Sequence, residues 1–181
     1  FVMFLALSRV WPKATCTKDS TLGSSVLVSV RGAEDFSAAR LKEEVGAIVR
    51  QDIPLLRRHV KKDAAIARYR AQGREDKARL LTWLERDSCS EYGYEGYSDN
   101  FFGEMAPSTG YLTVWDVLPA DGGFLFVYPD ELEPDKLARL SPMPQLFGVF
   151  SEGERWCRLM ECENVADLNE RTVSGRIREL I

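Results

Sequence analysis

The pattern of apolar residues over positions 37–50 is that of an amphipathic helix. Its apolar members recur at steps of three and four residues and so share one helix face: Ala38, Leu41, Val45, Ile48 and Val49. Charged residues cover the other face, and Ser37 is suited to cap the N-terminus. The same reasoning predicts further helices over residues 1–11, 64–72, 77–86, 146–162 and 172–181.

Strands are predicted where apolar and polar residues alternate. Over residues 25–30, Val26, Val28 and Val30 alternate with other residues, and their β-branched side chains favour a strand. Asp121 and Gly122 predict a tight turn between two strands. Further strands are expected over residues 14–17, 55–60, 89–97, 111–117 and 124–128. Residues 130–144 are expected to form an irregular crossover, and residues 164–169 a connector. The element order predicts an α+β fold, a mostly antiparallel sheet packed by helices with a C-terminal helical extension.

The composition is that of an ordinary globular chain, with 181 residues of which 45% are hydrophobic and 29% charged. No apolar run approaches the roughly 20 residues that a membrane span needs. The four cysteines show no Cys-x-x-Cys spacing, so we expect free thiols in a reducing, cytoplasmic compartment. His59 is the one histidine in the sequence, which argues against a Cys/His zinc site.

Charge is divided unevenly along the chain. Residues 1–86 hold 17 Lys and Arg against 10 Asp and Glu, a net +7, and the remainder holds a net −11. A basic half can attract nucleic acid, and the run over residues 57–62 is its densest part. The simpler interpretations are that the two halves attract each other, and that the run guards a strand edge.

The stretch over residues 97–112 (YSDNFFGEMAPSTGYL) is the candidate binding loop. Its predicted ligand-binding residues are Tyr97, Asp99, Phe101, Phe102, Glu104, Met105, Ser108 and Thr109. The aromatic rings of the loop and its flanks form either a platform for a base or part of a core; they are Tyr92, Tyr94, Tyr97, Phe101, Phe102, Tyr111 and Trp115. The hydroxyls of Ser108 and Thr109 either bind a ligand or form hydrogen bonds with the backbone of their own turn. Asp99 and Glu104 flank the loop and are candidates for an acid–base pair, but without a metal or histidine nearby we predict no catalytic residue and no metal.

This loop resembles the one that forms the zinc pocket in the second additional, or editing, domain of threonyl- and alanyl-tRNA synthetases. There the motif reads Asp-x-Cys-x-x-x-His-x-Pro-Ser-Thr-Gly, and Asp99 and residues 107–110 match it. Phe101 stands at the Cys position and Met105 at the His position. Phe1 stands at the second histidine of a His-x-x-x-His pair. The resemblance covers about residues 1–115 and implies a retained scaffold without its editing chemistry.

A second resemblance extends over nearly the whole chain. It is to the N-terminal region of bacterial uridine kinase-like nucleoside kinases, and it rests on residues 72–77, 101–103, 107–112, 122–124, 145–147, 164–169 and 175–179. The resemblance implies an editing-domain-like domain over residues 1–129. Residues 130–181 would be a crossover and helical segment leading toward a kinase domain. This sequence contains no Gly-Lys dipeptide and therefore no phosphate-binding loop. Because it begins with Phe1 and its last predicted helix has no stop signal, we expect it to be part of a longer chain.

Two functional hypotheses follow from these resemblances. The first is a non-catalytic region of an ATP-dependent uridine or nucleoside kinase, with a ligand-binding, regulatory or assembly role. It implies ATP and Mg²⁺ only for the kinase domain, and as partners that domain, a small molecule or a second copy of the chain. The alternative is a tRNA-binding or tRNA-deacylating domain related to threonyl-tRNA synthetase, inactive for lack of zinc ligands. We expect no membrane association under either hypothesis.

Overall fold

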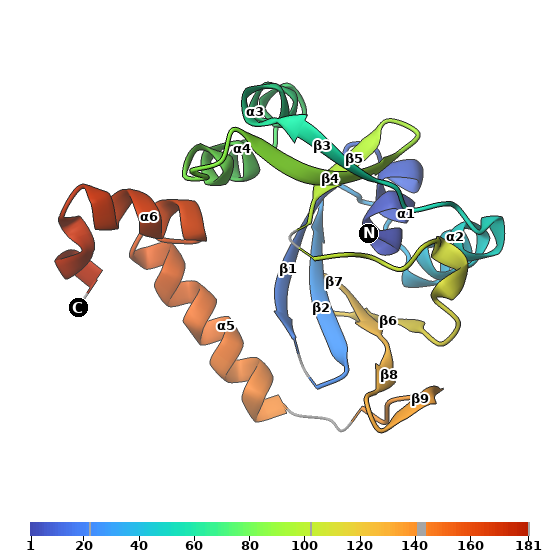
Figure 1. Cartoon of the computed structure of the whole chain (residues 1–181). Coiled ribbons are helices and arrows are strands. Elements are labelled where there is room, and N and C mark those ends of the chain that lie inside the picture. The colour runs from blue at the N-terminus through green and yellow to red at the C-terminus, as the bar shows by residue number, and fades with distance from the viewer. Residues whose placement is uncertain (22, 102, 141–143, 181) are drawn as a thin grey trace. The chain divides into compact units, whose positions relative to one another are not determined.

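The computed structural model describes the chain except at positions 22, 102, 141–143 and 181 (Figure 1). Its fold class is α+β, as predicted. The chain forms two compact units, each built from two segments. Unit 1 contains Phe1–Arg57 and Tyr92–Pro142, and unit 2 contains Arg58–Glu91 and Met143–Ile181. The domain boundary expected between residues 129 and 130 stays a prediction.

Unit 1 is organised around a four-stranded antiparallel sheet with the order β1-β2-β7-β6 (Figure 1). Val28 pairs with Phe124, and Phe126 pairs with both Val26 and Val117. The elements of this unit are α1 (Val2–Val10), β1 (Thr15–Thr21), β2 (Ser25–Arg31), α2 (Ala38–Gln51), β5 (Tyr97–Asn100), the 3₁₀ turn η1 (Thr109–Tyr111), β6 (Asp116–Ala120), β7 (Gly123–Val127), β8 (Pro129–Asp130) and β9 (Glu133–Leu137).

The core of unit 1 confirms the predicted faces of β2 and α2. Val28 from β2 and Leu41, Val45 and Ile48 from α2 are fully buried in one cluster with Phe124. The side chain of Ser37 caps α2 as expected, accepting the N–H of Arg40 at 3.4 Å. These contacts hold α2 against the sheet, and so they fix where its C-terminal end lies.

Glycine is required at position 123, where β7 passes close to β2. A Cβ atom there would lie 2.9 Å from the Cα of Ser29, which is closer than real Cβ atoms approach. The predicted turn over Asp121 and Gly122 is present, because Ala120 pairs with Gly123 across it. The close approach lets Ser29 pair with Gly123 in the ladder.

Three sequence-based predictions in unit 1 are wrong. The strand expected over residues 89–97 ends at Tyr94, and Glu95 and Gly96 turn the chain into β5 with φ values of 48° and 84°. The strand expected over 111–117 is mostly loop, because η1 ends at Tyr111 and β6 starts only at Asp116. Residues 130–144 contain the β8–β9 hairpin rather than an irregular crossover.

Unit 2 is mainly helical, and its core joins α3, α4 and β4. The buried members are Ala65, Tyr69, Ala78, Leu81 and Cys89. Its helices are α3 (Lys62–Ala71), α4 (Glu75–Thr82), α5 (Pro144–Leu159), α6 (Val165–Val173) and the 3₁₀ turn η2 (Arg176–Leu180). It also contains all but the first residue of β3 (Arg57–Lys61) and the first four residues of β4 (Ser88–Tyr94). β3, β4 and β5 form a sheet in that order, so β3 is an edge strand.

The C-terminal segment departs from its prediction in two places. Residues 164–169 were expected to be a connector, but Asn164 caps α6, and Asn164 and Asp167 form a reciprocal capping box. The helix expected over 172–181 is wrong, because α6 ends at Val173 and Gly175 has a φ of 75°. All four cysteines are free. Within the described residues, no helix combines the length and apolar character needed to cross a bilayer.

Candidate functional site

The Pro-Ser-Thr-Gly turn of the candidate loop is fastened to the C-terminal end of α2. The buried hydroxyl of Thr109 accepts the N–H of Ile53 at 2.8 Å and donates to the carbonyl of Ile48 at 2.8 Å. The N–H of Thr109 donates to the carbonyl of Ile53 at 2.9 Å. This hydroxyl therefore closes the end of the helix, where carbonyl groups lack helical partners.

Ser108 and Gly110 contact the residue that ends α2. The Ser108 hydroxyl donates to Oδ1 of Asp52, and the N–H of Gly110 donates to the same oxygen at 3.1 Å. Asp52 has a left-handed backbone with a φ of 48°. The hydroxyls of Ser108 and Thr109 thus bond α2 rather than their own turn, and their predicted contact with a ligand stays a prediction.

Four aromatic rings gather beside this turn. Phe1 lies 5.6 Å from Tyr97 and 6.2 Å from Phe101, and Tyr92 lies 6.1 Å from Phe101, all between ring centroids and in edge-on geometry. We call these four residues the aromatic cluster. The N–H of Met105 donates to the Tyr92 hydroxyl at 3.1 Å, which ties Met105 to the cluster. Tyr92 is buried, while the other rings and Met105 are half-buried.

The two carboxylates of the loop lie in different environments. Asp99 is only 3% exposed and accepts hydrogen bonds from the Tyr97 hydroxyl at 3.0 Å and from the N–H of Asn100 at 2.8 Å. The side chain of Glu104 is 86% exposed and forms an ion pair with Arg57 at 3.6 Å. The two carboxylates thus differ in exposure and in their partners, and the acid–base pair for which they are candidates stays a hypothesis. Phe102, also a predicted site residue, lies outside the described residues.

The residues at the zinc-ligand positions of the synthetase motif do not fit zinc. Phe1 and Phe101 present ring carbons and Met105 a thioether, whereas zinc sites in proteins use thiolate, imidazole or carboxylate donors. The described part of the chain contains no cluster of three His, Cys, Asp or Glu residues arranged to hold a metal ion. The two rings nonetheless lie together, so the fold still brings these positions to one place.

The basic residues of the first half of the sequence are divided between the two units of the fold. Unit 1 holds 10 Lys and Arg against 15 Asp and Glu, a net −5, while unit 2 holds 14 against 13, a net +1. Within the run over residues 57–62, Arg58, His59 and Lys61 are exposed, and Lys62 donates to the carbonyl of Leu84 at 3.0 Å. The run except for Lys62 lies on edge strand β3, where charged side chains discourage pairing with another chain.

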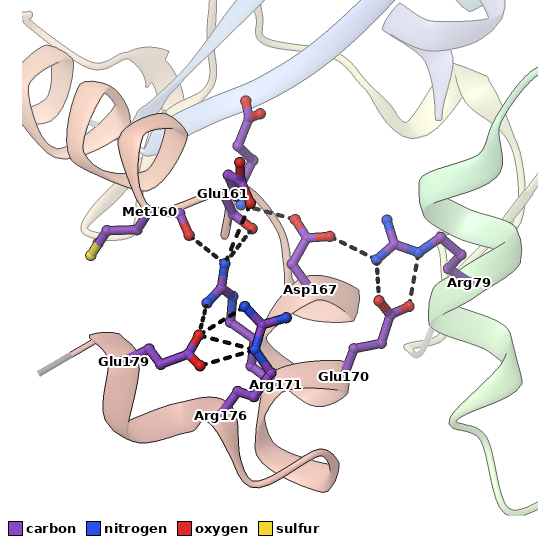
Figure 2. Close-up of polar contacts among 9 residues, drawn as sticks. Arg79, Met160, Glu161, Asp167, Glu170, Arg171, Arg176 and Glu179 are labelled. Atoms are coloured by element: carbon purple, nitrogen blue, oxygen red, sulfur yellow. Dashed lines mark hydrogen bonds and ion pairs between the residues drawn. The ribbon is translucent and has the colours of Figure 1, made fainter.

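An ion-pair network in unit 2 joins α4 to α6 (Figure 2). The Arg79 guanidinium donates to both oxygens of Glu170, at 2.9 and 2.7 Å, and to Asp167 at 2.8 Å. These bonds raise the pKa of Arg79. In Figure 2, Arg171 bonds the carbonyl of Met160 at 2.7 Å and pairs with Glu179 at 3.2 Å. Every charge in this group has a partner within the protein, so we interpret the network as structural.

Sequence reasoning missed a cleft on the outer face of α2 in unit 1. The cleft has a volume of about 440 Å³ and is lined by Ala39, Lys42, Glu43, Gly46, Arg50 and Trp115. The available signal was Gly46, because a glycine in a helix interior is costly and usually has a packing or functional reason. A Cβ atom at this position would lie 3.8 Å from Cη2 and Cζ2 of Trp115 and 3.2 Å from the Arg50 guanidinium.

Comparisons with known proteins find similarity to threonine–tRNA ligases. The chain is 25% identical over 128 residues to that of Desulfovibrio desulfuricans and 30% identical over 127 residues to that of Listeria welshimeri. It is 28% identical over 125 residues to that of Desulfosudis oleivorans. Each match covers 68% of this chain but only about a fifth of the ligase, 20%, 20% and 19% respectively. No family model matches the chain.

The chain is thus distantly similar to part of threonine–tRNA ligases, which agrees with the first resemblance seen in its sequence. The relatives named above are ligases, and the expected resemblance to nucleoside kinases stays a prediction. ATP, Mg²⁺, a kinase-domain partner, a second copy of the chain and a cytoplasmic location also stay predictions.

Proposed function

We propose that this chain is a tRNA-binding domain of the threonyl-tRNA synthetase editing type that does not hydrolyse aminoacyl-tRNA. The proposal rests on the contact between Phe1 and Phe101, whose ring centroids lie 6.2 Å apart. These are two positions where the synthetase motif has metal ligands. Their closeness, together with the similarity to threonine–tRNA ligases, favours a common architecture for the loop.

Loss of hydrolysis follows from the chemistry of the replaced side chains. Metal-dependent hydrolysis needs an ion that activates a water molecule, and Phe1, Phe101 and Met105 offer such an ion no donor. The remaining carboxylate near the cluster, Asp99, already accepts bonds from Tyr97 and Asn100. Half-buried aromatic rings can still stack on the base or ribose of a tRNA end.

The charges of unit 1 predict a weak dependence of this binding on salt. The logarithm of nucleic-acid affinity falls linearly with the logarithm of the salt concentration, and the slope is proportional to the number of phosphates that the protein neutralises. Arg57, whose side chain is 37% exposed, is the cation paired with the loop through Glu104. We therefore assign phosphate contact to Arg57 and expect Glu104 to oppose it.

The proposal is tested by titrating the chain with threonine-accepting tRNA in a gel shift at two salt concentrations, alongside a deacylation assay with mischarged tRNA. We expect micromolar binding and no deacylation with or without added zinc. Arg57→Gln should weaken binding and Glu104→Gln should strengthen it. Arg139→Gln, an exposed arginine elsewhere in unit 1, should change neither result. Zinc-stimulated deacylation, or no binding at low salt, would refute the proposal.

A second role rests on a sequence-based expectation alone, the resemblance of residues 164–169 and 175–179 to the N-terminal region of nucleoside kinases. The second candidate is a non-catalytic region that acts on a nucleoside kinase domain. It predicts that adding this chain changes the KM for uridine of a bacterial uridine kinase, while the chain alone transfers no phosphate from ATP. An unchanged KM would remove this candidate.

A further inference from the structure

We propose that Cys157 and Cys162 form a reversible dithiol–disulfide site that reacts with small disulfides such as oxidised glutathione. The site lies in unit 2, where α5 ends and the chain turns toward α6, so it is separate from the aromatic cluster. Both thiols are free and half-buried. The inference goes beyond both candidate functions, because it assigns a chemical modification to residues that neither of them uses.

The end of α5 brings these two cysteines together. Residues five positions apart on an unbroken helix point in different directions, but α5 ends at Leu159 and Glu161 has a left-handed backbone with a φ of 51°. The N–H of Cys162 donates to the carbonyl of Cys157 at 2.9 Å. The N–H of Glu161 donates to the carbonyl of Arg158 at 3.1 Å. These two bonds and the positive φ define a Schellman motif, in which the two cysteines are the outer pair.

The motif places the two residues within reach of a disulfide bond. Side chains at these two positions of a Schellman motif frequently contact each other. Because a hydrogen bond of 2.9 Å joins the backbones of Cys157 and Cys162, their Cα atoms lie no more than about 7 Å apart. Disulfides span Cα separations of up to about 6.8 Å, so the bridge needs little movement of the backbone.

The turn that carries the two thiols is held in place by α6. The Arg171 guanidinium donates to the carbonyl of Met160 at 2.7 Å and to that of Glu161 at 3.5 Å (Figure 2). Asn164, two positions after Cys162, begins the capping box of α6. The backbone around both thiols is therefore fixed, which raises the effective concentration of one thiol at the other.

The reaction is a two-step thiol–disulfide exchange. One cysteine thiol loses its proton, and the thiolate attacks a sulfur of the small disulfide and releases one of its halves as a thiolate. The second cysteine then loses its proton and attacks the mixed disulfide, which releases the other half. The two cysteine sulfurs are oxidised, and the small disulfide is reduced to two thiols that take up the two protons. The bridge locks the turn between α5 and α6, and excess reduced glutathione releases it.

The test equilibrates the full chain with mixtures of reduced and oxidised glutathione, blocks the remaining thiols and maps tryptic peptides by mass spectrometry. Trypsin cuts after Arg155, Arg158 and Arg171, so the bridge appears as residues 156–158 linked to residues 159–171. We expect this linked pair to exceed glutathione adducts at either cysteine by at least about tenfold. Cys157→Ser and Cys162→Ser should each leave only the glutathione adduct on the remaining cysteine of the pair.

Variants at Glu161 distinguish the effect of the turn from mere closeness in sequence. Glu161→Gly keeps the positive φ, which glycine adopts freely, and should retain or increase the preference for the bridge. Glu161→Pro removes both the N–H donor and the positive φ, and should reduce the preference to that of the unfolded chain.

The unaltered chain supplies a comparison that needs no variant. The equilibrium constant for forming the bridge should be at least about tenfold larger without urea than in denaturing urea, because the folded turn already holds the two cysteines together. Glutathione adducts that outnumber the bridge, equal bridge formation with and without urea, or equal bridge formation by Glu161→Gly and Glu161→Pro would each overturn the inference.

Discussion

The carboxylate of Asp52 occupies the space where a side chain at position 110 would begin. A Cβ atom on Gly110 would lie 2.9 Å from Cγ of Asp52, and Oδ1 of Asp52 accepts the N–H of Gly110 at 3.1 Å. A side chain at position 110 would therefore displace the carboxylate of the residue that ends α2, 58 positions earlier in the chain.

We predict that Gly110→Ala lowers the free energy of unfolding by about 1–3 kcal/mol, as overpacking typically does. Asp52 must move away and lose its bonds to Ser108 and Gly110. Gly103→Ala in the same loop is the matched control, because a Cβ atom there meets nothing within 4 Å. The measurement is urea unfolding, and equal stability of the two variants would contradict the role given to Asp52.

Thr109→Val removes a buried hydroxyl while keeping the shape of the side chain. We expect a loss of about 1–3 kcal/mol, because the N–H of Ile53 and the carbonyl of Ile48 lose their partner at a buried position, where Thr109 is only 1% exposed. Ser108→Ala, at a half-buried position, should cost less. A similar effect for both changes would show that the hydroxyl of Thr109 has no special part in closing α2.

Placing donors at the positions where the synthetase motif has metal ligands should create a metal site. We predict that the variant with Phe1→His, Phe101→Cys and Met105→His binds one Co²⁺ or Zn²⁺, because one thiolate and two imidazoles are a sufficient protein set for zinc. Cobalt absorption bands from the thiolate are the readout. The double variant that retains Phe1 should bind more weakly. A folded triple variant that binds no metal would mean that the three positions do not converge on one point.

The α4–α6 network should make unit 2 sensitive to acid. Burial raises the pKa of Asp167, but hydrogen bonds from Arg79 and from the N–H groups of Glu163 and Asn164 outweigh this and lower it. A carboxylate with a lowered pKa stabilises the folded state above its unfolded value of about 4, and the contribution disappears as the pH falls through the folded value.

Asp167→Asn should therefore be less stable than the unaltered chain at neutral pH, and the difference should shrink as the pH falls below about 4. Urea unfolding at a series of pH values, followed by circular dichroism, measures this convergence. Asp135→Asn, an exposed aspartate in β9, should leave the pH dependence unchanged. A difference that stayed constant with pH would show that the charge of Asp167 is not involved.

Sequence reasoning predicted best the elements in which the regularly spaced apolar residues are also the buried ones. The stripe of Leu41, Val45 and Ile48 is fully buried, and Val28 lies in the core as its alternation predicted. The hairpin at Glu95 and Gly96 was missed because the aromatic residues on both sides read as one continuous strand. The hairpin over residues 129–137 was missed because the Pro and Asp residues over positions 130–144 suggested irregular structure.

The residues of the candidate site could be predicted from the sequence, but the hydrogen bonds that join them to α2 could not. The loop residues were named from the motif, whereas the bonds from Thr109 to Ile48 and Ile53 join residues more than 50 positions apart. Contacts of this kind depend on tertiary packing, which a local pattern does not encode. The approach of Gly46 to Trp115 was not predicted for the same reason, since the two residues meet only in the fold.

The discontinuous make-up of the two units bears on how the chain is synthesised. Residues 58–91 leave the ribosome well before residues 143–181, with which they form one compact unit. The first half of unit 1 must likewise wait for β7 and β6 before its sheet is complete. A nascent polypeptide stalled near residue 90 would contain two incomplete units at once, each exposing apolar surface that a chaperone could bind.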